Sequence, residues 1–306
     1  MNLATKISSL SLSNPTMLAS GILGVTRGSL KYAMENGAAA CVIKSISLEE
    51  RTGHHAPNMI TFEGGMLNAV GYSNPGVKEA KKEFINLKEL PGPVIASIVG
   101  KDAEEFAAMA EELLPGEFSA VEMVLSCPHT PGYGTMAGQS SPDITEKITQ
   151  AVRAKTDLPL FVKLSPDSPG IGQVAKAAEA GGADAITAGN TMGPGMILDV
   201  ITGQPILDFK MGGVSGAALR PIMVRCIYDI YKSVSIPIIG CGGVINGRDA
   251  VEMMMVGASA VQVGTAIHYR GIEVFNKITK EIEDILEQRG DSSIKDIIGF
   301  THKLEE

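Results

Sequence analysis

The chain has 306 residues, a formal net charge of −8 and a pI near 5.3, and 44% of its residues are apolar. The length suits one large α/β barrel or two ordinary domains. A nucleic-acid-binding protein would carry a basic face, and no apolar run reaches the ~18 residues of a membrane span. The first residues lack the charged and then apolar pattern of a secretory signal. We therefore expect a cytoplasmic protein without nucleic-acid or membrane partners.

Eight short apolar runs alternate with helix-like segments. The expected strands cover residues 17–20, 39–43, 94–97, 120–125, 158–163, 183–188, 236–240 and 259–264. Helices are expected over residues 102–114, 143–156, 172–180 and 247–256. Asp102 is a candidate N-cap, and Ser141 followed by Pro142 is typical of a helix start.

A strand followed by a helix, eight times over, predicts a single α/β domain over residues 1–306, a (β/α)₈ TIM barrel. The alternative is a doubly wound sheet, but ASGILG after the first strand has the wrong glycine spacing for its dinucleotide motif. The connections 45–77, 126–142 and 189–217 are too long for plain turns. We expect them to form long loops over the C-terminal mouth of the barrel.

Polar residues or glycines follow seven of the eight expected strands, at the ends where barrel enzymes place their chemistry. Gly242-Gly243 and Gly264-Thr265 follow the last two strands. Glycine leaves backbone N–H groups accessible there, which favours a phosphate site over ordinary turns.

Two lysines end apolar strands. Lys163 either points into the barrel mouth, where a cation stabilises a reduced flavin, or is a surface lysine. Lys44 could hold an anionic substrate group or the cofactor, or it could likewise be a surface lysine.

The four cysteines, Cys41, Cys127, Cys226 and Cys241, have no C-x-x-C spacing, so neither a zinc nor an iron–sulfur site is expected. Cys41 and Cys226 are predicted core residues, and Cys241 fits a glycine turn. Cys127 opens a loop just past a strand, which favours a general base over a packing role.

Nine segments together resemble one known family. They are NPTMLASGILG, IKS, NAVGYSNPG, SCPHTPGYG, KLSP, GNTMGPGMILD, GGVSG, GCGGVING and VQVGTA, and they run essentially end to end. The chain resembles the catalytic subunit of the class 1B dihydroorotate dehydrogenases. The resemblance implies an FMN barrel that oxidises dihydroorotate to orotate in pyrimidine synthesis, with electrons passed to a partner subunit carrying FAD and an iron–sulfur cluster. It also implies a homodimer of this chain within a heterotetramer.

The resemblance also implies roles for individual residues. Cys127 matches the catalytic base. The positions that match FMN contacts are Ser20, Lys44, Ser45, Lys163, Gly216, Gly242, Gly243, Gly264 and Thr265. The positions that match substrate contacts are Lys44, Asn68, Ala69, Val70, Gly71, Tyr72, Asn190 and Thr191. Asn68, taken by itself, is equally typical of a tight turn.

Four positions depart from the family pattern. Val124 replaces an asparagine that touches both flavin and substrate, and His129 replaces a second asparagine. Ser97 stands where asparagine is common, and Gly189 where a bulky aliphatic residue is usual. Two alternatives therefore stay open: a related enzyme acting on another dihydropyrimidine or enone, and a non-catalytic flavin-binding subunit.

Overall fold

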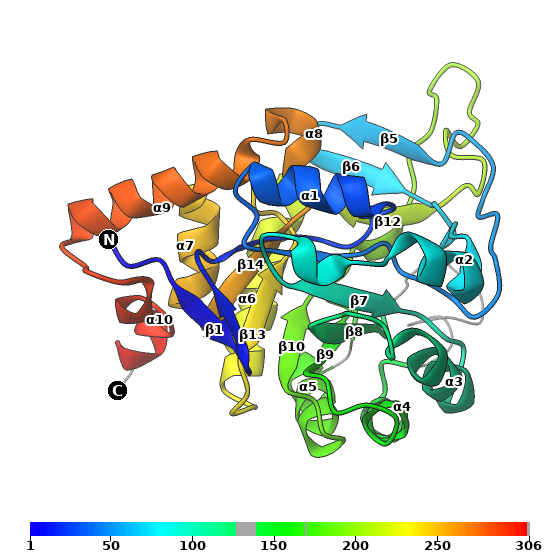
Figure 1. Cartoon of the computed structure of the whole chain (residues 1–306). Helices are drawn as coiled ribbons and strands as arrows, with labels where there is room; N and C mark the ends of the chain where they lie inside the picture. The colour runs from blue at the N-terminus through cyan, green and yellow to red at the C-terminus, as the bar shows by residue number, and fades with distance from the viewer. Residues whose placement is uncertain (127–138, 169, 305–306) are drawn as a thin grey trace.

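A computed structural model describes residues 1–126, 139–168 and 170–304 (Figure 1). Eight parallel strands close into a barrel, each beside the next one along the chain. They are β3 (Thr16–Leu18), β4 (Ala40–Val42), β7 (Val94–Ile98), β8 (Ala120–Val124), β9 (Leu160–Leu164), β10 (Ala185–Ala188), β13 (Ile238–Cys241) and β14 (Ala258–Val263). This confirms the predicted (β/α)₈ barrel and all eight strands, and it rules out the doubly wound sheet.

Helices surround the barrel (Figure 1). The longer ones are α1 (Arg27–Glu35), α2 (Gly76–Glu83), α3 (Ala103–Leu113), α4 (Pro142–Arg153), α5 (Ile171–Ala180), α6 (Arg220–Tyr231), α7 (Gly247–Met255) and α9 (Val274–Arg289), and the short α8 (Ala266–Arg270) and α10 (Phe300–Lys303) flank α9. The four predicted helices are confirmed within a few residues. Asp102 caps α3, since its side chain accepts a hydrogen bond of 2.9 Å from the backbone N–H of Glu105. Ser141 occupies the N-cap position of α4 but makes no side-chain capping bond. No helix among the described residues is long and apolar enough to cross a membrane.

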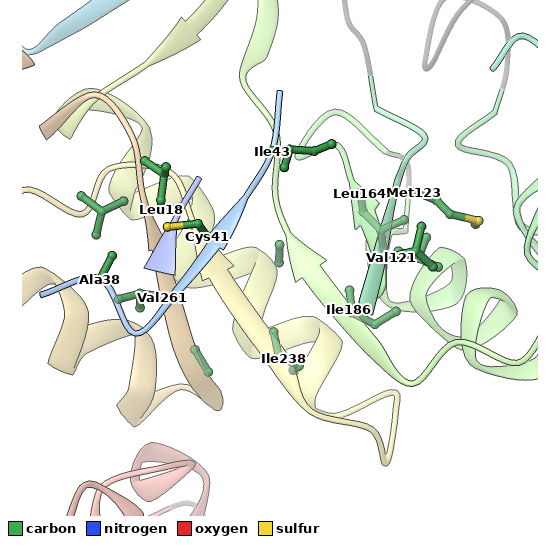
Figure 2. Packing of buried hydrophobic residues seen from close by; sticks show 14 of the residues in the cluster. Leu18, Ala38, Cys41, Ile43, Val121, Met123, Leu164, Ile186, Ile238 and Val261 are labelled. Carbon is green, nitrogen blue, oxygen red and sulfur yellow. The ribbon is translucent and has the colours of Figure 1, made fainter. Parts of the chain in front are cut away.

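Two apolar clusters hold the barrel together. The larger one packs the outer faces of the strands against the helices, and Figure 2 shows Leu18, Cys41, Val121 and Val261 within it. The smaller one fills the barrel and includes Met17, Ile95, Phe161 and Ile239, together with residues from the N-terminal hairpin of β1 (Thr5–Ile7) and β2 (Leu10–Leu12). The hairpin therefore covers the N-terminal end of the barrel. Cys41 and Cys226 are buried, as predicted.

A second sheet forms beside the barrel. Its antiparallel order is β11 (Met192–Gly195), β12 (Gly212–Ser215), β6 (Gly65–Asn68) and β5 (Met59–Phe62). Its strands come from two of the long connections, 45–77 and 189–217, so these connections are not plain loops. The third connection lies largely in 127–138, outside the described residues. Figure 1 shows β5, β6 and β12 together near α8.

Candidate active site

A cavity of about 310 Å³ lies between the C-terminal ends of the barrel strands and the second sheet. The predicted site residues that line it are Ser20, Lys44, Ser45, Asn68, Val70, Gly71, Tyr72, Lys163, Asn190, Thr191, Gly216, Gly242, Gly243, Gly264 and Thr265. The fold thus brings together residues as far apart in the sequence as Ser20 and Thr265. Ala69 packs instead with Leu67 and Leu207 in a small apolar cluster. Cys127 lies outside the described residues.

Three serine hydroxyls form a cluster on the β3, β4 and β7 side of the mouth. The Oγ atoms of Ser20 and Ser45 are 3.1 Å apart, and those of Ser45 and Ser97 are 2.9 Å apart. Ser97 is fully buried and does not line the cavity, whereas Ser20 and Ser45 do. Ser97 therefore orients the two hydroxyls that face the cavity.

Two glycines after β13 have a conformation that only glycine adopts readily. Gly242 has φ of 109° and Gly243 has φ of 89°. A Cβ on Gly243 would lie 2.6 Å from the backbone of Arg220, so any side chain would force the chain apart. Gly264 differs, because a Cβ there would meet its nearest atom at an ordinary 3.5 Å. The first pair therefore shows a steric need for glycine at the cavity wall, and Gly264 does not.

Lys163 is a buried residue, which settles the choice between an inward and a surface lysine. Its Nζ donates a hydrogen bond of 3.0 Å to Oε1 of Gln262 and lies 3.6 Å from Oε1 of Glu122. Only 5% of its side chain is exposed. The cavity therefore has a cation in its inner wall, contributed by β9.

Cys241 was predicted to be a small residue in a glycine turn, but it is the last residue of β13 and lines the cavity beside Lys163. Burial raises the pKa of the Cys241 thiol and outweighs the opposing effect of Lys163. Burial alone would lower the pKa of Lys163, but Cys241 and Glu122 together raise it above its ordinary value. Cys241 and Glu122 therefore both favour the charged form of Lys163.

The side chain of Asn190 is fixed between two strand ends. Its Nδ2 donates to the carbonyl of Ser126 at 3.1 Å, and its Oδ1 accepts from the N–H of Thr191 at 2.8 Å. Asn68 ends β6, and its Nδ2 lies 3.4 Å from the carbonyl of Gly213 in β12. Both residues line the cavity, and a backbone carbonyl holds the amide of each in place.

Val124 and Gly189 make one part of the cavity wall apolar. Val124 is 4% exposed and pairs in register with Lys163. A Cβ on Gly189 would lie 2.6 Å from the carbonyl oxygen of Leu164. The backbone at this place therefore excludes the bulky aliphatic residue that the family pattern has there.

Sequence reasoning missed the buried partners of Lys163. Glu122 and Gln262 stand in the apolar runs AVEMVL and SAVQVG, at positions whose side chains point into the barrel. A polar residue in a strand that is buried on both faces needs a partner inside the protein. The polar residues in these two apolar runs were therefore the sequence signal for a buried partner.

Comparison with known proteins places this cavity in a family context. The family model described as "Dihydroorotate dehydrogenase" matches residues 2–286. A Methanosarcina acetivorans protein described as "Dihydroorotate dehydrogenase B (NAD(+)), catalytic subunit" is 46% identical over 300 residues, which cover 97% of this chain and 96% of that protein. Proteins of the same description from Methanothermobacter thermautotrophicus and Pyrococcus horikoshii are 44% and 42% identical, with 98% and 99% of this chain and 98% of each relative covered. The chain therefore belongs to the dihydroorotate dehydrogenase family of oxidoreductases.

Proposed function

We propose that the chain binds FMN in the cavity described above and oxidises dihydroorotate to orotate in the cytoplasm, as a step of pyrimidine synthesis. The observation that carries the proposal is the buried Lys163 ammonium in the wall of a cavity bordered by Gly242 and Gly243. A flavin needs both features, a cation for its reduced ring and accessible backbone N–H groups for its phosphate. The names of the relatives support the choice of substrate.

The residues around the cavity divide into two groups by chemistry. Gly242, Gly243, Gly264 and Thr265 would hold the phosphate of FMN, and bound FMN would supply the hydride acceptor. The flavin ring would lie against two hydroxyls, two cations and one glycine that allows close approach of the backbone. These are Ser20, Ser45, Lys44, Lys163 and Gly216. The steric need for glycine at 242 and 243 supports this division.

The substrate would lie against the remaining wall. Lys44 would bind its carboxylate, and the amides of Asn68 and Asn190 would each offer a donor and an acceptor to the ring. Val70, Gly71, Tyr72 and Thr191 complete that wall. The Sγ atom of Cys127 would take the proton from ring carbon C5 as the double bond to C6 forms.

Electrons would leave through a partner subunit that carries FAD and an iron–sulfur cluster, with two copies of this chain in a heterotetramer. Support comes from the relatives, which are described as catalytic subunits of an NAD(+) enzyme. The sequence itself has no C-x-x-C pair for a cluster.

A second candidate is oxidation of a different dihydropyrimidine, favoured by the apolar wall of Val124 and Gly189. The two can be separated by turnover with an artificial electron acceptor, comparing dihydroorotate with dihydrouracil, which lacks the carboxylate. We expect release of FMN on denaturation and turnover of dihydroorotate only. Release of FAD, or a preference for dihydrouracil, would contradict the proposal.

A further inference from the structure

A layer of polar side chains lies inside the barrel, beneath the cavity. Glu122 of β8 is fully buried, and its Oε2 accepts hydrogen bonds from Thr187 of β10 at 2.9 Å and from Nε2 of Gln262 of β14 at 2.6 Å. Its Oε1 has no hydrogen-bond partner among the described residues and lies 3.6 Å from Nζ of Lys163. One carboxylate thus connects three strands and faces one ammonium group.

Glu122 lies one inward-facing position below the cavity wall. Val124 pairs in register with Lys163, while Glu122 pairs with Phe161, which belongs to the apolar filling of the barrel. Lys163 lines the cavity, and Glu122 is not among the described residues that do so. Any effect of Glu122 on a molecule in the cavity must therefore act through the lining residues that contact it, Lys163 and Gln262.

An isolated buried charge costs several kcal/mol in a protein interior and is relieved when it finds a partner or becomes neutral. Removal of the Glu122 carboxylate would therefore lower the pKa of Lys163 and favour loss of its proton. Among the described residues, Glu122, Gln262 and Cys241 face its ammonium from the surrounding strands, and Glu122 is the carboxylate among them.

We propose that Glu122 is a positioning residue that keeps Lys163 charged and fixes its ammonium in the wall of the flavin site. This inference rests on the FMN proposal, since a fixed cation matters there because it favours the reduced, anionic flavin. The competing explanation is that Glu122 only connects β8, β10 and β14. The two explanations differ in whether Lys163 remains charged without Glu122.

The test is an anaerobic redox titration of the bound flavin from about pH 6 to about pH 10, a window below the usual pKa of lysine. The proteins are the wild type, Glu122→Gln, Lys163→Gln and the double variant. In Glu122→Gln the midpoint potential should lie at or above the wild-type value at low pH, because an unbalanced cation remains. It should fall to the Lys163→Gln value at high pH, as Lys163 loses its proton. Neither the wild type nor the double variant should show this break, that is, the pH-dependent fall of the midpoint potential to the Lys163→Gln value.

Thr187→Val is the matched control, because it removes a hydrogen bond to the carboxylate but leaves both charges in place. It should follow the wild type across the pH range. A Glu122→Gln profile parallel to the wild type, or the same break in Thr187→Val, would overturn the role of Glu122. A wild-type chain that binds no flavin would instead refute the FMN proposal.

The proposal stays testable if Glu122→Gln does not fold. In that case the double variant should recover the fold, because it leaves no unpaired buried cation. A double variant that folds no better than Glu122→Gln would contradict the proposal.

Discussion

Single residues decide what the cavity can bind, and Val124 has the clearest consequence. It pairs with Lys163 on the inner face of the barrel and lines the cavity, yet it can neither donate nor accept a hydrogen bond. A ring amide facing it would lose about 1–3 kcal/mol of hydrogen-bond energy.

Restoring the amide should therefore improve substrate binding. We expect Val124→Asn to tighten orotate binding by ~5- to 150-fold, the range that corresponds to that energy, and to raise turnover of dihydroorotate. Orotate affinity can be measured from the change in the flavin spectrum. Val124→Leu is the control, since it keeps the wall apolar and should not tighten binding. Failure of both the wild type and Val124→Asn to turn over dihydroorotate would reject this substrate.

The role of Cys127 can be tested in the same way. As a general base it should contribute ~10²- to 10⁴-fold, so Cys127→Ser should slow flavin reduction at neutral pH by at least ~10²-fold and leave FMN binding intact. The rate should recover partly at high pH, as the hydroxyl becomes a better base. Stopped-flow reduction of the flavin measures this directly. Cys226→Ala, in α6 and away from the cavity, serves as control, and an unchanged rate in Cys127→Ser would exclude the base role.

At the scale of elements, the sequence predicted the barrel well and the second sheet poorly. The eight barrel strands are short apolar runs because both faces of a barrel strand are buried. In the second sheet, β5 and β11 have no fully buried residue, and β5 alternates between exposed and half-buried residues. The strand pairing of this sheet joins residues as distant as Asn68 and Gly213, and no local pattern can predict such a contact.

The starts of α3 and α4 show that a residue typical of an N-cap need not make a capping hydrogen bond. Both Asp102 and Ser141 were predicted as caps, but only Asp102 makes the side-chain bond. Asp102→Ala should lower the free energy of unfolding by about 1 kcal/mol, with a range of about 0.5–2. Ser141→Ala, the matched control, should change it by less than ~0.5 kcal/mol. Urea denaturation of both variants tests this, and equal losses would contradict the assigned cap.

For the whole molecule, much of the site could be predicted because the barrel topology gathers the strand ends in one place. Lys163 and the glycines after β13 follow from that rule. The hydrogen-bonded group beneath Lys163 could not be predicted in this way. Glu122, Thr187 and Gln262 come from three different strands, and their contact depends on the register of the closed barrel. The apolar position of Ala69 depends likewise on the packing of Leu207 from a distant segment.

Two buried thiols should make the free energy of unfolding decrease at alkaline pH. Burial raises the pKa of Cys41 to about 12 and that of Cys226 to about 11, from an ordinary 9.0. Between pH 9.0 and the raised pKa values, the unfolded chain loses thiol protons that the folded chain retains. The contribution of these thiols to the free energy of unfolding is therefore complete below pH 9.0 and is lost as the pH rises. Each thiol should lower the free energy of unfolding by about 1.4 kcal/mol per pH unit at most.

Denaturation curves between about pH 8 and about pH 10.5 measure this slope. Cys41→Ala should make the slope less steep by the share of one thiol, whatever its effect on stability at neutral pH. An unchanged slope in that variant would show that Cys41 ionises as freely in the folded protein as in the unfolded chain.

The central claim is that this barrel holds a flavin which dihydroorotate reduces. The most direct measurement is the absorbance of the purified chain, loaded with FMN and kept under anaerobic conditions, as dihydroorotate is added without any other electron acceptor. We predict loss of the yellow absorbance of the oxidised flavin and formation of one orotate per flavin reduced. A flavin spectrum that stays oxidised at saturating dihydroorotate would contradict the claim.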